Sequence, residues 1–572
     1  MSRLPPMRRE GMSVAAAPNT AGRRTWWGWG RADRQLDDTA VTGLGSVLAD
    51  RFGSAPGKPA VAVDPGSVAL TAPRVALPDG LADLASADPE DRLRHGHGNA
   101  YREVVRALHG DVPHVPDLVV RPRDADDVER LLDWCSDARV SCVPYGGGTS
   151  VVGGVTPPPG PTVSLDLERL DRVLEVDAVS GAAHVQAGML GPAIEDGLRP
   201  DGWTLRFFPQ SFEFSTLGGW IATRAGGHFA TGPTHIDDLV ESISAVTPSG
   251  RWTSRRLPAS GAGPSPDRLL LGSEGTLGVV TDAWVRVQRR PQSRASVTLV
   301  FPTEARALDG VRALLQDGMR PSNCRLLDPV EAALNGAGPP DGTDTVLVLA
   351  FEAPTAPLDA EVARALELLR DHGAEVRDGP TLRRGDRTGA AEGAAGAWRA
   401  AFLQAPYLRD GLVRLGAVVE TFETATTWDR AADLVATLRQ TARRAATEVC
   451  GGALVAVRTT HAYPDGIAPY VTVIAPGPTD LGGVAGARAA AAAWDEVKAA
   501  VGEAIDAAGA TATHHHAVGR DHRPVYDRQR PAPFAVAMRA ARDAVDPAGI
   551  LNPGVLFDPS PGTVGDDALH GA

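Results

Sequence analysis

Three consecutive glycines after a strand-like segment could bind an anion. They lie in the sequence PYGGGTS at residues 144–150, where glycine permits backbone angles that other residues avoid. Successive N–H groups of such a run can curl into a concave site, and Thr149 and Ser150 add hydroxyl donors, so a diphosphate is the expected guest. The run does not match the dinucleotide motif G-x-G-x-x-G, because Val151 stands at the position of the third glycine. A simple hairpin turn would use the same residues.

Two later segments also combine glycine with small polar residues. Residues 210–216 read QSFEFST and run into LGGW and TRAGG, and residues 272–280 read GSEGTLGVV. Ser215 or Thr216 could cap a helix, and the two glycines of LGGW would let that helix approach a flat ring closely. A glycine-rich helix packed against a neighbour is the structural alternative. Each segment is ambiguous alone, whereas the three in this order are specific.

Two arginines with apolar neighbours could hold an anionic group. Arg325 lies in CRLLD and Arg409 lies in YLRD. A guanidinium binds a phosphate or a carboxylate through two hydrogen bonds, and a bound anion would offset the cost of burying the cation. Internal ion pairs with Asp328 and Asp410 are the alternative.

Three consecutive histidines, His514, His515 and His516, are candidates for proton transfer. An imidazole titrates near neutral pH, so one or two of them could accept a proton from an alcohol in an active site. In an extended strand their side chains alternate between faces, so all three could not bind one metal ion, and we expect no metal. A solvated polar run is the alternative.

Further candidates lie in RTTHAYPDG and APYVTV. His461 lies in the first segment, beside an arginine and a tyrosine. Tyr470 lies in the second, where a tyrosine is a core residue unless a reacting atom comes within hydrogen-bond reach. His228 and His235 could merely pack within the first half of the chain.

The composition excludes several classes of protein. The 572 residues are 43% hydrophobic and 22% charged, which is ordinary for a globular chain of two or three domains, and the net charge of −13 argues against a nucleic-acid partner. Lys58 and Lys498 are the only lysines, and neither lies in a phosphate-binding loop or a context typical of a Schiff base. The four cysteines form no C-x-x-C, and no G-x-S-x-G occurs, which argues against zinc frameworks, disulfide scaffolds and serine hydrolases. The arginine, alanine and glycine bias indicates a GC-rich bacterial genome.

The order of expected elements indicates an α+β fold in two main parts. Hydrophobic spacing predicts a strand at 119–120, a helix at 125–136 and a strand at 140–144, and such pieces alternate to about residue 290. From about residue 295, strands such as SVTLVF, DTVLVLAF and YVTVIAP lie between long helices. This second pattern is typical of an antiparallel sheet with flanking helices.

The first 34 residues combine seven arginines with Trp26, Trp27 and Trp29. This N-terminal segment could be flexible with its tryptophans packed on the folded domains, or it could contact an anionic membrane surface. No apolar run reaches eighteen residues, and the N-terminus has no basic-then-apolar signal pattern. We therefore expect a cytoplasmic protein with reduced thiols, and peripheral membrane contact stays open.

Together the segments resemble the vanillyl-alcohol oxidase / p-cresol methylhydroxylase (PCMH) family of flavoproteins and, within it, the alkylglycerone-phosphate synthases. The resemblance covers roughly residues 25–557 and rests on PYGGGTS, QSFEFSTLGGWIATRAG, IDDLV, GSEGTLGVV, WWGWG, RHGHG, CRLLDP, YLRD, TFETATTWDR and HHHAVG. It implies a two-subdomain, PCMH-type FAD-binding domain and a cap domain with an antiparallel sheet and flanking helices. The implied divisions are an N-terminal basic and helical region at 1–110, the FAD-binding domain at 111–292, the cap at 293–534, a segment returning to the FAD-binding domain at 535–557 and a disordered tail at 558–572.

The resemblance also assigns roles by position. Noncovalent FAD would contact Pro144, Tyr145, Gly146, Gly147, Gly148, Thr149, Ser150, Gln210, Ser211, Phe212, Glu213, Phe214, Ser215, Thr216, Thr223, Arg224, Ala225, Gly226, Glu274, Gly275, Thr276, Leu277, Gly278, Val279 and Val280. Catalytic roles would fall to Tyr470, Arg325, His514, His515 and His516, and substrate binding to Arg409, with His461 as a further candidate.

The implied reaction replaces the acyl chain of an acyl-dihydroxyacetone phosphate by a fatty alcohol, forming an ether lipid without net redox change. The substrate would be a small lipid phosphate, and a homodimer stays open. Gln210 replaces an aspartate of the synthases, Gly226 a serine and Tyr145 an aliphatic residue. The ending DPAGILNPGVLF resembles flavin dehydrogenases of 2-hydroxy acids instead. Oxidation of a 2-hydroxy acid is therefore the alternative function.

Overall fold

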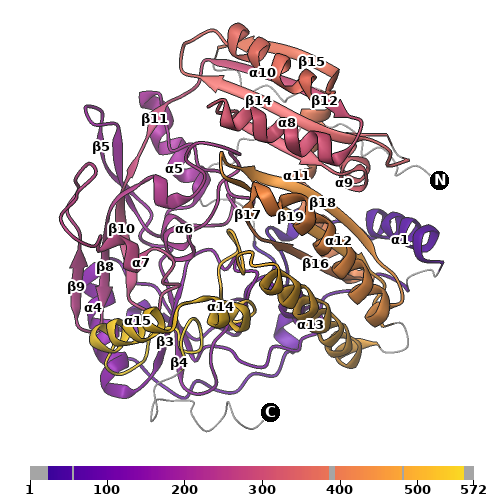
Figure 1. Ribbon diagram of the computed structural model, residues 1–572. Helices are drawn as coiled ribbons and strands as arrows, with labels where there is room; N and C mark the ends of the chain where they lie inside the picture. Colours follow the sequence, from indigo (N-terminus) through magenta and orange to yellow (C-terminus); the bar gives the residue numbers. More distant parts are fainter. Residues whose placement is uncertain (1–22, 54–56, 340, 386–392, 479–481, 559–572) are drawn as a thin grey trace.

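The computed structural model describes residues 23–53, 57–339, 341–385, 393–478 and 482–558, and of residues 393–403 only the backbone. Helices and sheets form two lobes that lie side by side (Figure 1). The first lobe holds a four-stranded and a five-stranded sheet, and the second holds one sheet of eight strands. The predicted α+β fold, with an antiparallel sheet in its second half, is confirmed.

The four-stranded sheet leads into the glycine run. Its order is β1–β2–β4–β3, in which β2, β4 and β3 pair in parallel. Asp124 is the N-cap of helix α4 (Ala125–Ala138), and its side chain accepts a hydrogen bond from the Asp127 N–H. The predicted strands and helix of this region are confirmed. The four strands are β1 (Ala85–Ser86), β2 (Leu118–Val120), β3 (Ser141–Tyr145) and β4 (Thr162–Asp166).

The five-stranded sheet of the first lobe is antiparallel, with the order β5–β6–β10–β8–β9. It shares one hydrophobic core with the four-stranded sheet. Its strands are β5 (Val173–Asp177), β6 (Ala182–Gln186), β8 (Val240–Thr247), β9 (Gly250–Thr253) and β10 (Val279–Arg286). The lobe also contains α5 (Gly191–Leu198), α6 (Leu217–Thr223), α7 (Asp267–Leu270) and the short pair β7 (Trp203–Thr204) and β11 (Gln288–Arg289).

The sheet of the second lobe has the order β15–β12–β14–β13–β18–β19–β16, and β17 lies beside β19. Helix α12 packs on β18 and β19, and α13 packs on α12 and β16 (Figure 1). The strands are β12 (Ser293–Phe301), β13 (Asn323–Leu327), β14 (Thr345–Ala353), β15 (Glu375–Arg384), β16 (Val418–Glu423), β17 (Thr426–Thr427), β18 (Leu454–Ala462) and β19 (Gly466–Ala475). The helices are α8 (Glu304–Gln316), α9 (Pro329–Leu334), α10 (Asp359–Asp371), α11 (Gly393–Arg414), α12 (Trp428–Cys450) and α13 (Gly483–Ala507).

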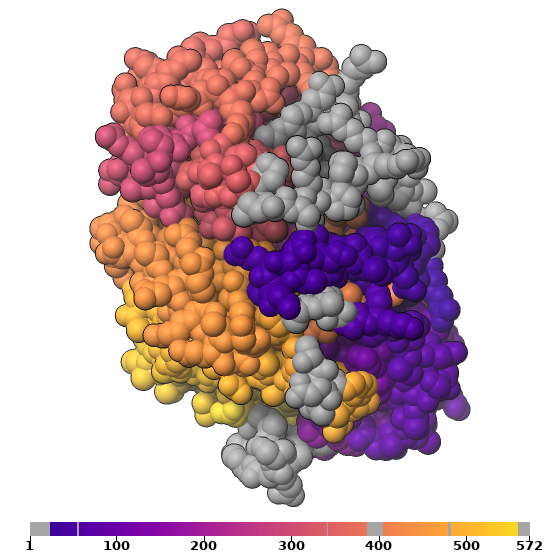
Figure 2. Space-filling view, turned by 90° about the vertical axis from the view of Figure 1, so that its right-hand side faces the viewer, coloured from indigo at the N-terminus to yellow at the C-terminus, as the bar shows by residue number. Residues whose placement is uncertain are grey.

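The N-terminal residues, indigo in Figure 2, lie against both lobes. Trp26, Trp27 and Trp29 are each only 6% exposed. The Trp29 N–H donates to Asp410 of α11 at 2.6 Å, and Arg34 forms an ion pair with Glu213 of the first lobe at 3.0 Å. The tryptophans therefore dock on the body and are not available to a membrane surface. Residues 1–22 lie outside the described residues, and so does the tail predicted to be disordered at 558–572, except for Asp558.

The remaining helices connect both ends of the chain to the two lobes. They are α1 (Asp38–Phe52), α2 (Pro89–Arg94), α3 (Tyr101–Leu108), α14 (Arg523–Gln529) and α15 (Ala532–Val545). The Tyr101 hydroxyl donates to Ala417 O of the second lobe. After α15 the chain returns to β3, where the Cys142 N–H donates to Ile550 O at 2.8 Å. No helix of the described residues combines the length and apolarity that crossing a bilayer requires.

Trp26→Ala should lower the thermal unfolding midpoint, because it opens a cavity in the core of the second lobe, at a cost of about 3–5 kcal/mol. Phe534→Ala is the control, since that ring is 44% exposed, and it should change the midpoint little. Differential scanning calorimetry gives both values. An unchanged midpoint for Trp26→Ala would contradict the docking of the N-terminal segment.

Candidate active site

The glycine loop (residues 146–150) has its carbonyl groups held by protein donors. Arg24 Nη2 donates to Gly147 O at 2.7 Å, and Asn99 Nδ2 donates to Gly148 O at 2.8 Å. Within the part of the chain that the structure describes, nothing accepts a hydrogen bond from the N–H groups of this loop. N–H groups left free in a turn of this kind form an anion site, so the loop fits the predicted diphosphate.

The glycine loop packs directly on the segment at 210–216. A Cβ at Gly147 would lie 1.6 Å from Phe214 O, and a Cβ at Gly146 would lie 2.3 Å from Thr216 Oγ1. Both distances are far below contact, so only glycine allows this approach. The structure thus brings together two of the segments that sequence analysis assigned to one cofactor.

Helix α6 begins where that segment ends. Thr216, one of the two predicted caps, is its N-cap and accepts a hydrogen bond from the Gly219 N–H. A Cβ at Gly218 would lie 2.8 Å from the Ala187 Cβ. Gly218 therefore allows the helix to pack against a neighbouring segment, which is the structural alternative left open for the glycines of LGGW.

Glu274 connects the third glycine-rich segment to the loop that follows the histidines. Its carboxylate accepts hydrogen bonds from the N–H groups of Val518 (2.9 Å) and Gly519 (2.8 Å). Asn552 Nδ2, from the C-terminal segment, donates to Glu274 O at 2.8 Å. Burial raises the pKa of Glu274 to about 7. Segments far apart in the sequence therefore meet at this residue.

The histidine run folds around one buried carboxylate. Glu423, at the end of β16, is 1% exposed and accepts hydrogen bonds from the N–H groups of His514 (2.6 Å), His515 (2.9 Å) and His516 (2.9 Å). The Thr513 hydroxyl donates to it at 2.6 Å. Burial by itself would raise the pKa of Glu423, whereas the hydrogen bond from the Thr513 hydroxyl favours the ionised carboxylate and lowers the pKa. The run is a tight loop of bends, so the alternation of side chains expected for a strand does not apply.

The side chains of this loop join two other histidines, and we call His235, His461, His514, His515 and His516 the histidine cluster. His514 Nδ1 lies 3.1 Å from His515 Nδ1, and His514 Nε2 lies 3.2 Å from His235 Nε2. The ring centroids of His461 and His514 are 5.0 Å apart. The predicted His461 and histidine run are therefore neighbours. His235, which we expected merely to pack, is part of the same network.

Burial keeps the inner imidazoles neutral. It lowers the pKa of His514 to about 4 and holds the pKa values of His461 and His515 well below their ordinary range. A neutral imidazole carries one free lone pair, so it can accept a proton or bind a metal ion. The inner rings are therefore unprotonated near neutral pH, and each keeps a ring nitrogen that can accept a proton during a reaction.

Two predicted residues border the cluster from the sheet of the second lobe. The Tyr470 ring on β19 lies 6.2 Å from the His515 ring in a stacked arrangement. Arg325 on β13 is fully buried and donates to Thr460 O (3.1 Å) and His228 O (2.7 Å), and burial lowers its pKa to about 9. Asp328, the alternative ion-pair partner, caps α9 and lies 3.4 Å from Arg439 instead.

Arg409 is linked to the glycine loop. Its guanidinium pairs with Asp410 at 2.9 Å, and its Nη1 donates to Asn99 O at 2.7 Å. Because Asn99 also donates to Gly148 O, Arg409 supports the glycine loop through one residue. The internal ion pair left open by the sequence is formed.

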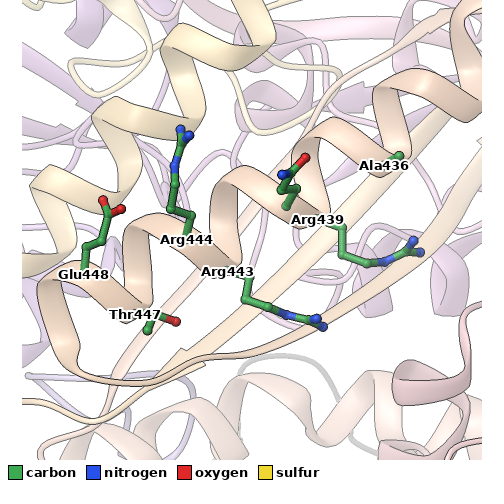
Figure 3. A pocket seen from close by; sticks show the side chains of 7 residues that line it. Ala436, Arg439, Arg443, Arg444, Thr447 and Glu448 are labelled. Carbon is green, nitrogen blue, oxygen red and sulfur yellow. The ribbon is translucent and has the colours of Figure 1, made fainter.

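A surface hollow lies along α12. Its lining includes Arg439, Arg443, Arg444 and Glu448. Arg439 and Arg443 point to one side of the helix and Arg444 to the other (Figure 3). The cations therefore do not converge on a common ligand, and we assign no function to this hollow.

Several residues that organise the site were missed from the sequence. Glu423 lies in TFETATTWDR and Asn552 in the ending DPAGILNPGVLF, so both were inside segments already singled out. Asn99 follows RHGHG directly, and Tyr463, whose hydroxyl lies 2.8 Å from His514 Nε2, follows His461 by two positions. Their positions in or beside these motifs could have marked them as candidates. Their roles could not be predicted, because they depend on contacts with residues far away in the sequence.

Glu423→Gln should loosen the histidine loop, because an amide replaces one acceptor oxygen by a donor that opposes the N–H groups. We expect the amides of residues 513–519 to exchange with deuterium at least about 10-fold faster, as measured by mass spectrometry. Glu420→Gln is the matched control, since Glu420 is buried on the same strand but binds Trp494 and Lys498. Equal exchange in Glu423→Gln and wild type would contradict the anchoring role.

Acid should destabilise the protein through the histidine cluster. The pKa of His514 in the folded protein, about 4, lies below its ordinary value of 6.5, so the unfolded chain binds the proton more readily. The stability from the neutral ring is present above pH 6.5 and is lost as the pH falls toward 4. His514→Gln should remove up to about 3 kcal/mol of this loss, measured as unfolding midpoints against pH. Parallel profiles for variant and wild type would refute a neutral His514.

Comparison with known protein families gives two matches. The family described as FAD binding domain matches residues 116–254, and the family described as FAD linked oxidases, C-terminal domain, matches residues 290–556. The first match contains the glycine loop and the segment at 210–216. The second contains Glu423 and all of the histidine cluster except His235. The cofactor is therefore FAD.

Whole-chain comparisons agree with this. Alkyldihydroxyacetonephosphate synthase of Dictyostelium discoideum is 29% identical over 507 residues, which cover 84% of this chain and 79% of that protein. A solved structure of an alkyldihydroxyacetonephosphate synthase matches with a TM-score of 0.77 at 25% identity, covering 93% of this chain and 98% of that one. The structure of p-cresol methylhydroxylase, at 15% identity, shares the fold with a TM-score of 0.65 over 83% of this chain and 94% of that one. The chain is an FAD-dependent enzyme, and it is similar to the alkyldihydroxyacetonephosphate synthases.

Proposed function

We propose that this enzyme replaces the acyl chain of an acyl-dihydroxyacetone phosphate by a fatty alcohol, without net redox change. The observation that carries the proposal is the group of buried, neutral imidazoles packed against the predicted FAD segment. A Cβ at Gly226 would lie 3.0 Å from the His515 Cβ, so this segment and the histidine loop are in contact. Bases next to the cofactor suit a reaction in which an alcohol must lose its proton.

The described residues fit FAD. The free N–H groups of the glycine loop suit its diphosphate, and the glycine-only contact with residues 210–216 places a second predicted segment beside that loop. Residues 223–226 and 274–280 would complete the site. Bound FAD would supply an electron-accepting ring to the substrate carbon.

The histidine cluster would take the proton of the alcohol. A neutral imidazole accepts it as the alcohol oxygen bonds to the glycerone carbon. His514 lies within hydrogen-bond distance of both His515 and His235, and His235 is partly exposed. The proton therefore has a route from the buried rings toward the surface.

Two arginines would hold the phosphate head group. Burial lowers the pKa of Arg325, and a phosphate beside it would favour the charged form. A guanidinium has five N–H donors, and the three described bonds of Arg409 leave two for a phosphate. A homodimer, a peripheral membrane contact and a cytoplasmic location stay predictions.

Incubation of the FAD-loaded protein with acyl-dihydroxyacetone phosphate and a long-chain alcohol tests the proposal. Without air or an electron acceptor, we expect an ether lipid and free fatty acid in equal amounts, detected by mass spectrometry. Absence of ether lipid, with dye reduction by lactate or glycolate, would contradict the proposal and indicate oxidation of a 2-hydroxy acid.

Gly147→Ala should weaken FAD binding at least about 10-fold, because the new Cβ would lie 1.6 Å from Phe214 O and displace the loop. The visible absorption of the purified protein reports FAD content. Gly43→Ala is the control, since nothing lies within 4 Å of a Cβ there. Full FAD content in Gly147→Ala would show that this loop does not hold the cofactor.

A further inference from the structure

Three imidazoles of the histidine cluster are arranged as metal ligands. His461, His514 and His515 each offer one ring nitrogen, and these nitrogens all lie within 4.8 Å of one another. We propose that they form a binding site for a divalent transition-metal ion of the zinc class. This site goes beyond the proposed function, which needs no metal ion.

The spacing of two nitrogens is close to that of a tetrahedral site. Zinc binds histidine nitrogen at about 2.0–2.1 Å, which places two nitrogens about 3.3 Å apart at the tetrahedral angle. His514 Nδ1 and His515 Nδ1 are 3.1 Å apart. The tight loop around Glu423 produces this pair, which an extended strand would have separated.

His461 supplies the third nitrogen in the form that a metal ion requires. Its Nε2 donates to Gly227 O at 2.8 Å, so Nδ1 carries the lone pair. His461 is 1% exposed, and its Nδ1 has no hydrogen-bond partner among the described residues. A histidine ligand ordinarily donates its other ring N–H to a carbonyl or carboxylate, as His461 does here.

The groups around the three imidazoles favour a cation, and the imidazole ligands favour a transition-metal ion. Glu423 Oε2 lies 3.4 Å from His515 Nδ1 and 4.0 Å from His514 Nδ1, so a buried negative charge adjoins the site. His514 Nε2 is already bound to Tyr463, which fixes the ring. Imidazole nitrogens suit zinc, copper, nickel and cobalt rather than magnesium or calcium. A bound ion would occupy the lone pairs that accept a proton.

Calorimetric titration of the full-length, FAD-loaded protein with Zn²⁺ after chelator treatment tests the site. We expect one ion per chain, and His461→Gln and His515→Gln should each weaken binding at least about 100-fold. His184→Gln is the matched control, because that ring pairs with Asp282 at 2.6 Å on another sheet, and it should change affinity less than about twofold.

A second readout reports the ligand geometry. Co²⁺ in a tetrahedral nitrogen site absorbs at longer wavelengths than the flavin, and this absorption should disappear in both cluster variants. The FAD spectrum and the unfolding midpoint identify variants that are folded. Zinc binding that is absent from wild type, or that persists unchanged in folded His461→Gln and His515→Gln, overturns the proposal. Neither result depends on ether formation.

Discussion

A single buried carboxylate organises the histidine cluster of this protein. Glu423 gathers the N–H groups of three consecutive histidines and the Thr513 hydroxyl, which bends residues 513–516 into a tight loop. Several hydrogen bonds to this carboxylate offset the free-energy cost of burying its charge, because a hydrogen bond to a charged acceptor is stronger than one between neutral groups. The bend brings the rings of His514 and His515 beside His461, and burial keeps them neutral. The proposed proton acceptors therefore depend on a residue that need not touch substrate.

The FAD-binding part of the site depends on the close approach of the glycine loop to the backbone of residues 210–216. Gly147 lies so near Phe214 O that no side chain fits between them, and Arg24 and Asn99 hold the carbonyl groups of the glycine loop. Asn99 also accepts from Arg409 of α11. The loop expected to bind the diphosphate is thus supported by the N-terminal segment and by the second lobe. Glu274 makes the corresponding link to the loop after the histidines.

Local sequence was sufficient for much of the fold. Helix α4 and its flanking strands follow from hydrophobic spacing. A helix cap was expected at Ser215 or Thr216, and the structure shows that Thr216 forms it. The candidate active site was harder to predict from the sequence, because its contacts join residues that are far apart in the chain. Nothing local distinguishes Glu423 from other acidic residues, and the shape of the histidine run depends on that carboxylate. The internal pairing of Arg409 with Asp410 was one of two open alternatives, and only the packing of α11 decides between them.

Burial around Glu423 keeps His514 and His515 as neutral imidazoles beside the FAD segment. Nuclear magnetic resonance of ring-labelled histidines in the FAD-loaded protein, assigned with His514→Gln and His515→Gln, tests it directly. We expect that neither ring takes up a proton as the pH is lowered through the ordinary histidine pKa of about 6.5. Titration of both rings near that value, as for exposed histidines, would contradict it.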